Sequence, residues 1–235
     1  MSSLFSKKNK FLVIAAHPDD EVLGLGGILA LAQNSKIKVT VLFIGEGISA
    51  RFKKNQFGSQ DYQKAHEIRQ KGCLKALKFL DINNIIFKER YCCRFDSYDI
   101  LDIVKDIEDV IIKEKPTHIF THNPIEVNVD HRITYQAVET ATRPLEGVFF
   151  NSIFTFEIPC SGNWVYENQF KPNVYVDITS VWDIKLKVWS FYKGEDKPFP
   201  FPRSNLGLQT LARYRGMQSG VELAEGIRLV RQVIK

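Results

Sequence analysis

The distribution of hydrophobic residues predicts that strands and helices alternate over the first 145 residues. Four short apolar runs are typical of buried strands, and they cover residues 11–16, 38–44, 84–87 and 118–121. Helical patterns lie between and after these runs, at residues 25–33, 62–80, 100–113 and 131–142. Strands that alternate with helices form a parallel sheet covered on both faces. The pattern therefore predicts an α/β fold of three layers with a mostly parallel sheet.

The third of these helices has the clearest pattern. Its apolar residues recur at intervals of three and four, and Pro116 follows shortly after the last of them. Proline at such a position ends a helix. Beyond Pro144, apolar segments at residues 152–158 and 173–178 predict two further strands, and residues 180–192 predict a helix before a proline-rich loop. Because no stretch resembles a linker between domains, we expect residues 1–235 to form a single domain.

The composition is that of an ordinary globular protein, with 44% hydrophobic and 25% charged residues and a formal net charge of +5. The lysines are scattered among acidic residues, which favours a solvated surface over a nucleic-acid-binding one. No apolar stretch approaches the roughly 18 residues of a membrane span, and the run at residues 11–16 is too short for the core of a signal peptide. We expect a cytoplasmic protein that binds a small molecule, and the sequence is compatible with a homo-oligomer.

The cysteines point to the same compartment. Cys73, Cys92, Cys93 and Cys160 show no CxxC spacing, and the adjacent pair does not readily form a disulfide with itself. We interpret all four as reduced thiols.

Charged residues gather directly behind the first predicted strand. The segment "AAHPDDEVLGLGG" places His17, Asp19, Asp20 and Glu21 there. Carboxylates this close together repel one another unless a positive group lies among them, and a metal cation is such a group. The carboxyl ends of parallel strands meet at one edge of a sheet. We therefore expect the segments "GEGISAR" and "THNPIEVNVDH", which follow the second and fourth strands, to lie at the same edge.

Three of these side chains suit a catalytic metal site. His17, Asp20 and His131 offer two imidazoles and a carboxylate, a usual ligand set for zinc with one open position, and iron or cobalt suits the same set. Asp19 lies next to a ligand and is placed to take a proton from water that the metal activates. Taken alone, however, the stretch "HPDDE" also fits a polar turn in which Asp20 caps the next helix.

The two motifs together are more specific than either alone. "AHPDDExxGxGG", followed about a hundred residues later by H-x-P-x-x-x-N-x-D-H-R, resembles the LmbE/PIG-L family of zinc-dependent N-deacetylases. The segment "GEGISAR" and the stretch from Phe201 to Arg231 are also similar to this family, and residues 55–100 are the least similar. The resemblance implies a Rossmann-like sandwich with its catalytic rim at the C-terminal ends of the strands.

The resemblance also implies roles for individual residues. His17, Asp20 and His131 match the zinc ligands, and Asp19 matches the general base that activates water. Asp130 matches an acid beside the active site.

Two positions depart from the family's usual pattern. Asn128 stands three residues before the last ligand, where many members have a histidine that stabilises the oxyanion, and Glu126 stands where many have aspartate. We assign the oxyanion donor to Asn128, whose amide donates a hydrogen bond but delivers no proton.

Three residues are candidates for substrate binding. Arg51 matches a substrate-contacting arginine of the family, and Arg203 follows the proline-rich loop, where it suits a phosphate group. His122 lies at the end of the fourth strand, where it suits substrate binding, the orientation of a ligand or a structural role. Four aromatic residues in late loops either line a sugar site or pack against the domain, namely Trp164, Tyr166, Phe199 and Phe201.

We therefore expect a zinc-dependent hydrolase that removes the acetyl group from an N-acetylated amino sugar or sugar conjugate, nucleotide-linked forms included. An esterase or amidase that acts on a non-sugar metabolite at the same site is the alternative, and an inactive sugar-binding relative is a third. The segment "GLGGILA" fits a dinucleotide-binding loop poorly, because its glycines begin too far behind the strand. We expect these glycines to let a helix approach the sheet closely.

Overall fold

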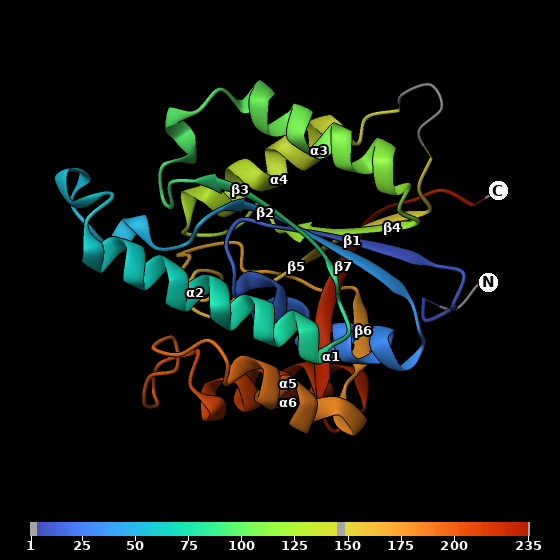
Figure 1. Ribbon diagram of the computed structural model, residues 1–235. Helices are drawn as coiled ribbons and strands as arrows, with labels where there is room; N and C mark the ends of the chain where they lie inside the picture. The colour runs from blue at the N-terminus through green and yellow to red at the C-terminus, as the bar shows by residue number, and fades with distance from the viewer. Residues whose placement is uncertain (1–3, 145–148, 235) are drawn as a thin grey trace.

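A sheet of seven strands separates two layers of helices in the computed structural model, which describes residues 4–144 and 149–234 (Figure 1). The strand order is β3-β2-β1-β4-β5-β7-β6. β1 to β5 pair in parallel, and β7 pairs antiparallel with both β5 and β6. The strands are β1 (Lys10–Ala15), β2 (Lys38–Gly45), β3 (Asn84–Arg90), β4 (His118–His122), β5 (Ser152–Phe156), β6 (Val174–Asp177) and β7 (Ala224–Gln232).

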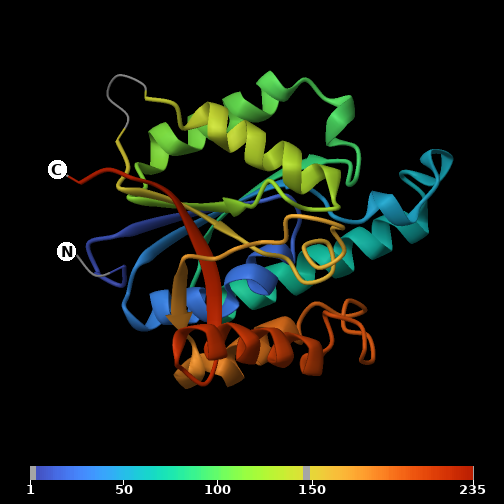
Figure 2. The same cartoon turned by 180° about the vertical axis from the view of Figure 1, so that it is seen from behind.

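The helices divide into two groups on opposite faces of the sheet (Figures 1 and 2). One face is covered by α1 (Asp20–Asn34), α2 (Gln60–Phe79), α5 (Trp182–Trp189) and α6 (Asn205–Ser219). The other face is covered by α3 (Ile100–Glu114) and α4 (Val129–Ala141). Short 3₁₀ turns lie at η1 (Ser49–Arg51), η2 (Lys54–Gln56), η3 (Phe95–Ser97) and η4 (Thr179–Val181). The predicted three-layer α/β architecture is confirmed.

Strand β1 shows why its sequence is apolar at every position. Phe11 and Val13 belong to the hydrophobic core beneath α1 and α2, whereas Leu12 and Ile14 belong to the core beneath α3 and α4. Successive side chains of a strand point to opposite faces, so a strand covered on both faces shows a continuous apolar run. The central strand therefore contributes to two separate cores.

The order of the strands determines where a ligand binds. The chain moves outward from β1 through β2 to β3, and then returns to add β4 on the other side of β1. Open α/β sheets bind ligands outside the carboxyl ends of the strands where the order reverses in this way. That point lies between β1 and β4, and the two predicted motifs directly follow these strands. The N-terminus and the C-terminus lie at the other end of the sheet (Figure 1).

The first helix begins earlier than its apolar pattern indicates. The prediction was residues 25–33, whereas α1 starts at Asp20, so the polar motif forms its first turn. The expected role of the glycines is confirmed, since a Cβ at Gly24 would overlap Phe156 and one at Gly27 would overlap Ile178. Helix α1 packs closely on the sheet because these positions lack a side chain.

Two elements near the C-terminus were not predicted as helix or strand. Helix α6 contains two glycines and has little separation of polar and apolar faces, so its periodicity is weak. Strand β7 is buried at Ala224–Ile227 and then alternates between exposed and partly buried residues, and its charged residues obscure the apolar run that marks a buried strand.

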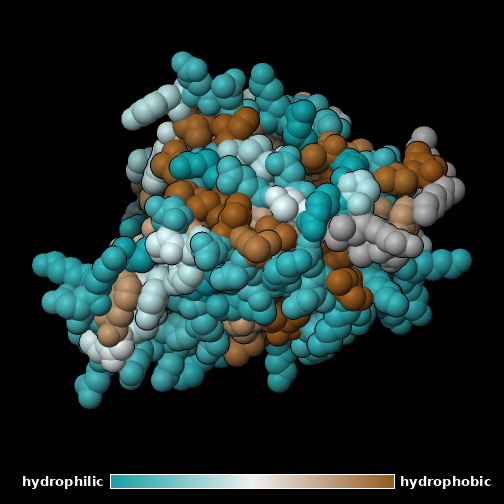
Figure 3. All heavy atoms as spheres, turned by 90° about the horizontal axis from the view of Figure 1, so that it is seen from above, coloured by the Kyte–Doolittle hydropathy of each residue, from teal (hydrophilic) through white to brown (hydrophobic). Residues whose placement is uncertain are grey.

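The described cysteines are all free thiols, as expected. No helix in residues 4–144 and 149–234 is long and apolar enough to cross a bilayer. On the face formed by α3 and α4, exposed hydrophobic side chains are interspersed with hydrophilic ones (Figure 3).

Candidate metal centre and active site

The loops after β1 and β4 bring the predicted metal ligands together at the switch point of the sheet. The ligand atoms of His17, Asp20 and His131 all lie within 4.8 Å of one another. Asp20 Oδ2 is 3.4 Å from His17 Nδ1 and 3.4 Å from His131 Nε2. All three side chains are buried. The prediction that these residues are neighbours in space is met by the geometry.

These separations fit a tetrahedral metal ion. Ligand atoms that lie about 2.0–2.1 Å from one zinc ion in tetrahedral geometry are roughly 3.4 Å apart. The two distances from Asp20 match that value. The donor set of two imidazole nitrogens and one carboxylate oxygen leaves a fourth position for water or substrate.

A buried carboxylate binds the second ring nitrogen of each histidine. Asp130 Oδ2 is 2.8 Å from His17 Nε2, and Glu126 Oε2 is 2.7 Å from His131 Nδ1. Contacts of this kind fix the tautomer and the ring orientation of metal-binding histidines. They leave His17 Nδ1 and His131 Nε2 as the nitrogens that face Asp20. Each proposed imidazole ligand is thus oriented from behind.

The surroundings of the two imidazoles favour positive charge. Burial by itself lowers the pKa of His131, but the carboxylates of Asp20 and Glu126 raise it to about 9. Burial also opposes protonation of His17, but the neighbouring Cys92 thiol and then the hydrogen bonds to Asp130 and Asp20 raise the pKa of His17 well above its ordinary value. The site therefore has a surplus of negative charge around the two imidazoles. It suits a divalent cation, which would take the place of those protons.

Further hydrogen bonds hold both orienting carboxylates, Asp130 and Glu126, in place. The backbone amides of Cys93 and Phe95, in the segment after β3, donate to Asp130. Glu126 accepts hydrogen bonds from the Ser161 hydroxyl and the Asn123 side chain. The Glu126 side chain reaches His131 Nδ1, so a carboxylate stands behind this proposed ligand.

Glu126→Gln is expected to weaken metal binding by roughly 10- to 100-fold, the usual effect of losing an orienting carboxylate. The substitution keeps the size of the side chain but removes the charge that raises the basicity of His131. The dissociation constant for zinc, measured by competition with a chelator, checks this. Glu139→Gln on the exposed face of α4 is the matched control, and an equal affinity in both variants would remove Glu126 from the metal centre.

Asp19 lies beside the cluster and is held by two arginines. Arg69 Nη1 is 2.6 Å and Arg203 Nη1 is 3.1 Å from Asp19 Oδ2. Burial raises the pKa of Asp19, and the two guanidinium charges oppose that rise. Its backbone has φ 138°, an unfavourable value for a residue with a side chain, and the Asp19 amide donates to Glu21. The structure thus maintains Asp19 in one orientation at the start of α1.

Arg51 is connected to the cluster through an intervening residue, Glu195. Its guanidinium donates to both carboxylate oxygens of Glu195, at 2.6 and 2.8 Å, and about half of its side chain is exposed. Glu195 also pairs with Arg69 and lies 3.8 Å from Arg203. Arg51 therefore stands at the outer end of a network that leads to Asp19, and a substrate contact by Arg51 or Arg203 stays a prediction.

Asn128 forms the N-cap of α4. Its Oδ1 accepts a hydrogen bond of 2.9 Å from the backbone amide of Asp130. This bond fixes which end of the amide accepts, so that Nδ2 is the end that can donate to a substrate. The assignment of Asn128 as oxyanion donor stays a prediction.

His122 is completely buried and stacks on His131, with ring centroids 4.0 Å apart. Its Nε2 accepts a hydrogen bond of 2.9 Å from the Ala16 amide, although the same atom lies 3.4 Å from Asp20 Oδ2. Since the lone pair of Nε2 points to Ala16, this nitrogen is not available as a metal ligand. His122 supports the His131 ring from behind, and its assignment to substrate binding stays a prediction.

The aromatic residues of the late loops are mostly exposed. Trp164 and Phe201 lie with ring centroids 6.4 Å apart, and the two loops that carry them meet there. Tyr166, Trp164 and Phe199 are exposed. Arg203 connects these loops to the cluster, because it donates to the Pro159 carbonyl and to Asp19.

Sequence reasoning assigned no role to four residues around the cluster. Arg69 and Glu195 were not singled out, because a charged residue in a lysine-rich helix or a proline-rich loop looks solvent-exposed. Glu21 accepts from the buried Tyr192 hydroxyl and from Asp19, and Glu46 accepts from the amides of Ile48, Ser49 and Cys92. Glu21 stood in the motif itself, which was the available signal.

A cavity of about 730 Å³ lies beside Glu126, and neither the three proposed ligands nor Asp19 is among its lining residues. Glu126, which contacts His131 Nδ1 from behind, lines the cavity together with Asn123, and Arg132, Lys171 and Arg228 add positive charge to its lining. The cavity is large enough for a sugar-sized molecule.

Comparison with known proteins agrees with this geometry. The PIG-L family model, described as GlcNAc-PI de-N-acetylase, matches residues 12–142. A diacetylchitobiose deacetylase of Thermococcus kodakarensis is 27% identical over 239 aligned positions, which cover 96% of this chain and 85% of that protein.

Solved structures show the same fold. N,N'-diacetylchitobiose deacetylase from Pyrococcus horikoshii, complexed with its inhibitor MPG, has a TM-score of 0.77 at 22% identity, covering 94% of this chain and 84% of that one. The 4-carboxy-2-hydroxymuconate hydratase of Pseudomonas putida KT2440 has a TM-score of 0.76 at 20% identity, covering 96% and 98%. Since a hydratase and a deacetylase share it, the fold alone does not specify the reaction. The family model spans both motifs and more than half of the 235 residues, and the chain therefore belongs to the PIG-L family.

Proposed function

We propose that this protein is a metal-dependent N-deacetylase that hydrolyses the acetamide of an N-acetylated amino sugar or sugar conjugate. The observation that carries the proposal is the convergence of His17, Asp20 and His131 at tetrahedral spacing, with Asp19 beside them. Zinc is the ion that this ligand set favours. Bound there, it would supply a Lewis acid for the amide carbonyl and lower the pKa of the attacking water.

Asp19 is the proposed general base. Its Oδ atoms take a proton from the attacking water, and the same carboxyl then passes that proton to the leaving amine. Arg69 and Arg203 have two roles in this step. Their charges favour the ionised carboxylate before the reaction, and their hydrogen bonds hold it in one orientation. Because Asp19 is buried, water competes little for the proton.

Asn128→Ala is expected to lower kcat by about 10- to 10³-fold, the range for the loss of one oxyanion-hole donor. The negative charge that develops on the carbonyl oxygen would lose the hydrogen bond from Nδ2. Steady-state kinetics on an N-acetylated sugar checks this, with KM expected to change less than kcat.

Asn128→Asp is the matched variant, because it keeps the oxygen that caps α4, removes the donor and adds a negative charge that the developing oxyanion repels, so kcat should fall at least as far as in the alanine variant. Loss of the cap in the alanine variant costs about 1 kcal/mol of stability, whereas the aspartate variant retains it. If Asn128→Asp turns over as fast as the parent, the oxyanion donor is another group.

The substrate class is supported by the relatives and by the rim of the site. The curated relative and one of the structural neighbours are named as deacetylases of diacetylchitobiose, whose substrate is an N-acetylated sugar. Exposed aromatic rings such as Trp164, on the loops joined to the cluster by Arg203, suit the apolar faces of sugars. We propose that Arg51 and Arg203 contact polar or anionic substituents of the same substrate.

A substrate panel tests the function directly. Acetate release is measured from N-acetylglucosamine, N,N'-diacetylchitobiose, a nucleotide-linked N-acetyl sugar, a simple O-acetyl ester and a non-sugar acetamide. The proposal requires the highest kcat/KM on one of the three N-acetyl sugars. A higher value on the ester or on the non-sugar amide would replace it with the esterase or amidase alternative.

A further inference from the structure

The cavity beside Glu126 is separate from the proposed active site. Its volume of about 730 Å³ lies within the range of small-molecule binding sites. None of the three proposed metal ligands lines it. Glu126 does, but its carboxylate is already engaged with His131 Nδ1 and the Ser161 hydroxyl. The cavity is therefore a second place where this protein can hold a small molecule.

Three cationic side chains line this cavity without a carboxylate partner. Arg132 lies at the start of α4, Lys171 precedes β6, and Arg228 lies on β7. Within residues 4–144 and 149–234, no carboxylate forms an ion pair with any of the three. The lining contains one carboxylate besides Glu126, that of the exposed Glu167. The lining thus has a clear excess of positive charge.

Backbone carbonyls hold the two arginines in place. Nη1 of Arg132 donates to the carbonyls of Glu126 and Val127. Nη1 of Arg228 donates to the Lys171 carbonyl at 3.1 Å. A neutral carbonyl orients a guanidinium but leaves its charge uncompensated, and the guanidinium has five N–H donors in all. Each arginine therefore keeps donors for an anionic group, which a guanidinium binds through paired hydrogen bonds.

A buried hydroxyl lies beside Arg228 and has no hydrogen-bond partner. Thr155 on β5 is fully buried and lines the cavity, and its Oγ1 is unpaired within the part of the chain that the structure describes. Thr155 and Arg228 are directly opposite each other on β5 and β7, so their side chains share one face of the sheet. Phe154 and Phe156 belong to the core on the other face. An unpaired buried hydroxyl is unfavourable, and a ligand oxygen in the cavity would satisfy it.

The chemistry of the lining indicates what kind of ligand it fits. The three cations and Glu167 together give a charge of +2, which a phosphate group of about −1.5 to −2 balances better than a single carboxylate does. Ile125, Phe170 and Val230 are also in the lining, and they suit the carbon skeleton of an organic molecule rather than a bare ion.

We propose that this cavity is a second ligand site, which binds a phosphorylated small molecule of about the size of a sugar phosphate. Arg132, Lys171 and Arg228 bind the phosphate group, and the Thr155 hydroxyl donates to one of its oxygens. The apolar side chains contact the rest of the molecule. This binding does not rest on the proposed deacetylase function.

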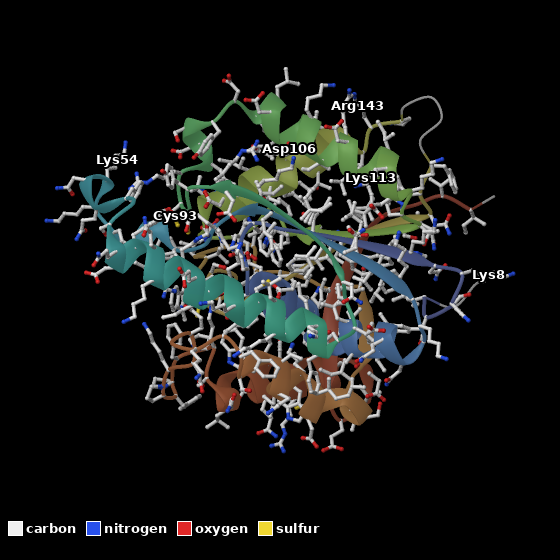
Figure 4. All side chains as sticks on the ribbon, in the orientation of Figure 1. Lys8, Lys54, Cys93, Asp106, Lys113 and Arg143 are labelled. Atoms are coloured by element: carbon white, nitrogen blue, oxygen red, sulfur yellow. The ribbon has the colours of Figure 1, made fainter. Side chains whose placement is uncertain are left out.

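Glucose 6-phosphate is the probe, with glucose as its uncharged counterpart, and isothermal titration calorimetry on the zinc-loaded protein measures both. We expect one glucose 6-phosphate per chain and no binding of glucose over the same concentrations. Arg228→Ala should weaken the binding by at least about tenfold, because hydrogen bonds to a charged group are lost. Arg143→Ala is the matched control and should bind as the parent does. Arg143 pairs with Glu108, and Figure 4 labels it far from Cys93, which marks the metal-centre end of the sheet.

Thr155→Val separates a role in binding from a role in the fold. The substitution keeps the branched shape and removes the hydroxyl, so glucose 6-phosphate should bind about two- to tenfold more weakly, the effect of one lost hydrogen bond. The melting temperature of the protein without ligand should stay the same or rise, because an unpaired buried hydroxyl is removed. Unchanged binding in this variant would exclude Thr155 from the site.

Two results would overturn the proposal as a whole. One is the absence of glucose 6-phosphate binding to the parent, and the other is binding of unchanged affinity in Arg228→Ala. If Arg203→Ala removes that binding instead, the phosphate lies in the active site. Acetate release is measured separately on the same preparations. If no acetate is released but glucose 6-phosphate binds as expected, the proposed function fails while the second site stands.

Discussion

Asp20→Ala is expected to abolish metal binding and to lower acetate release by more than about 10³-fold. The substitution removes a ligand itself, so its effect should exceed the 10- to 100-fold loss of metal affinity or activity that follows the loss of an orienting carboxylate. Asp20 Oδ2 is the atom that both imidazoles face, at 3.4 Å each. Without it, two buried histidines remain and no charged ligand balances the ion. Metal content of the purified variant, together with its acetate release at added zinc, checks the prediction.

The control for this variant is Asp102→Ala, since Asp102 is also an aspartate in the first turn of a helix but lies exposed on α3. It separates the loss of a ligand from the loss of a favourable charge at a helix start. Asp20→Ala protein that carries as much metal as Asp102→Ala would exclude Asp20 as a ligand.

Asp19→Asn is expected to lower turnover by about 10²- to 10⁴-fold, the contribution of a general base, while the metal content stays at that of the parent. The amide keeps the size of the side chain but accepts no proton from water. Arg69 and Arg203 lose their charge partner, and Glu195 is the carboxylate that remains beside them. We therefore also expect a lower melting temperature. Kinetics, metal analysis and thermal unfolding of one preparation check the three expectations together.

Asp183→Asn, at an exposed aspartate of α5, is the control for the change of charge. Loss of metal along with activity in Asp19→Asn would make Asp19 a ligand and reverse the roles assigned to the two adjacent aspartates.

The sheet and the metal cluster could be predicted from sequence because their signals are local. A strand covered on both faces is apolar throughout, as in residues 11–16, and the groups that follow such strands must meet at one edge. His17, Asp20 and His131 follow from this rule once the strands are found. Asp20 could not be separated from a helix cap by sequence alone, and the structure resolves the point: Asp19 occupies the N-cap position, with no capping bond from its side chain, and Asp20 is the first residue of α1.

The support of the site could not be predicted, because its contacts join residues that are distant in the chain. Arg69 on α2 and Glu195 in the loop after α5 meet Asp19 only through tertiary packing. A buried arginine and an exposed one look alike in a sequence, and nothing local distinguishes Arg69 from the lysines around it. The same holds for β7, whose charged residues alternate with apolar ones because the end of the strand is partly exposed.

Removal and return of the metal test the central claim most directly. The parent protein is stripped with a chelator, and acetate release from the best N-acetyl sugar is followed as zinc is added back. The account predicts no release from the stripped protein and full recovery at one zinc ion per chain. Release that persists after the metal is removed, or that does not return when zinc is restored, would contradict it.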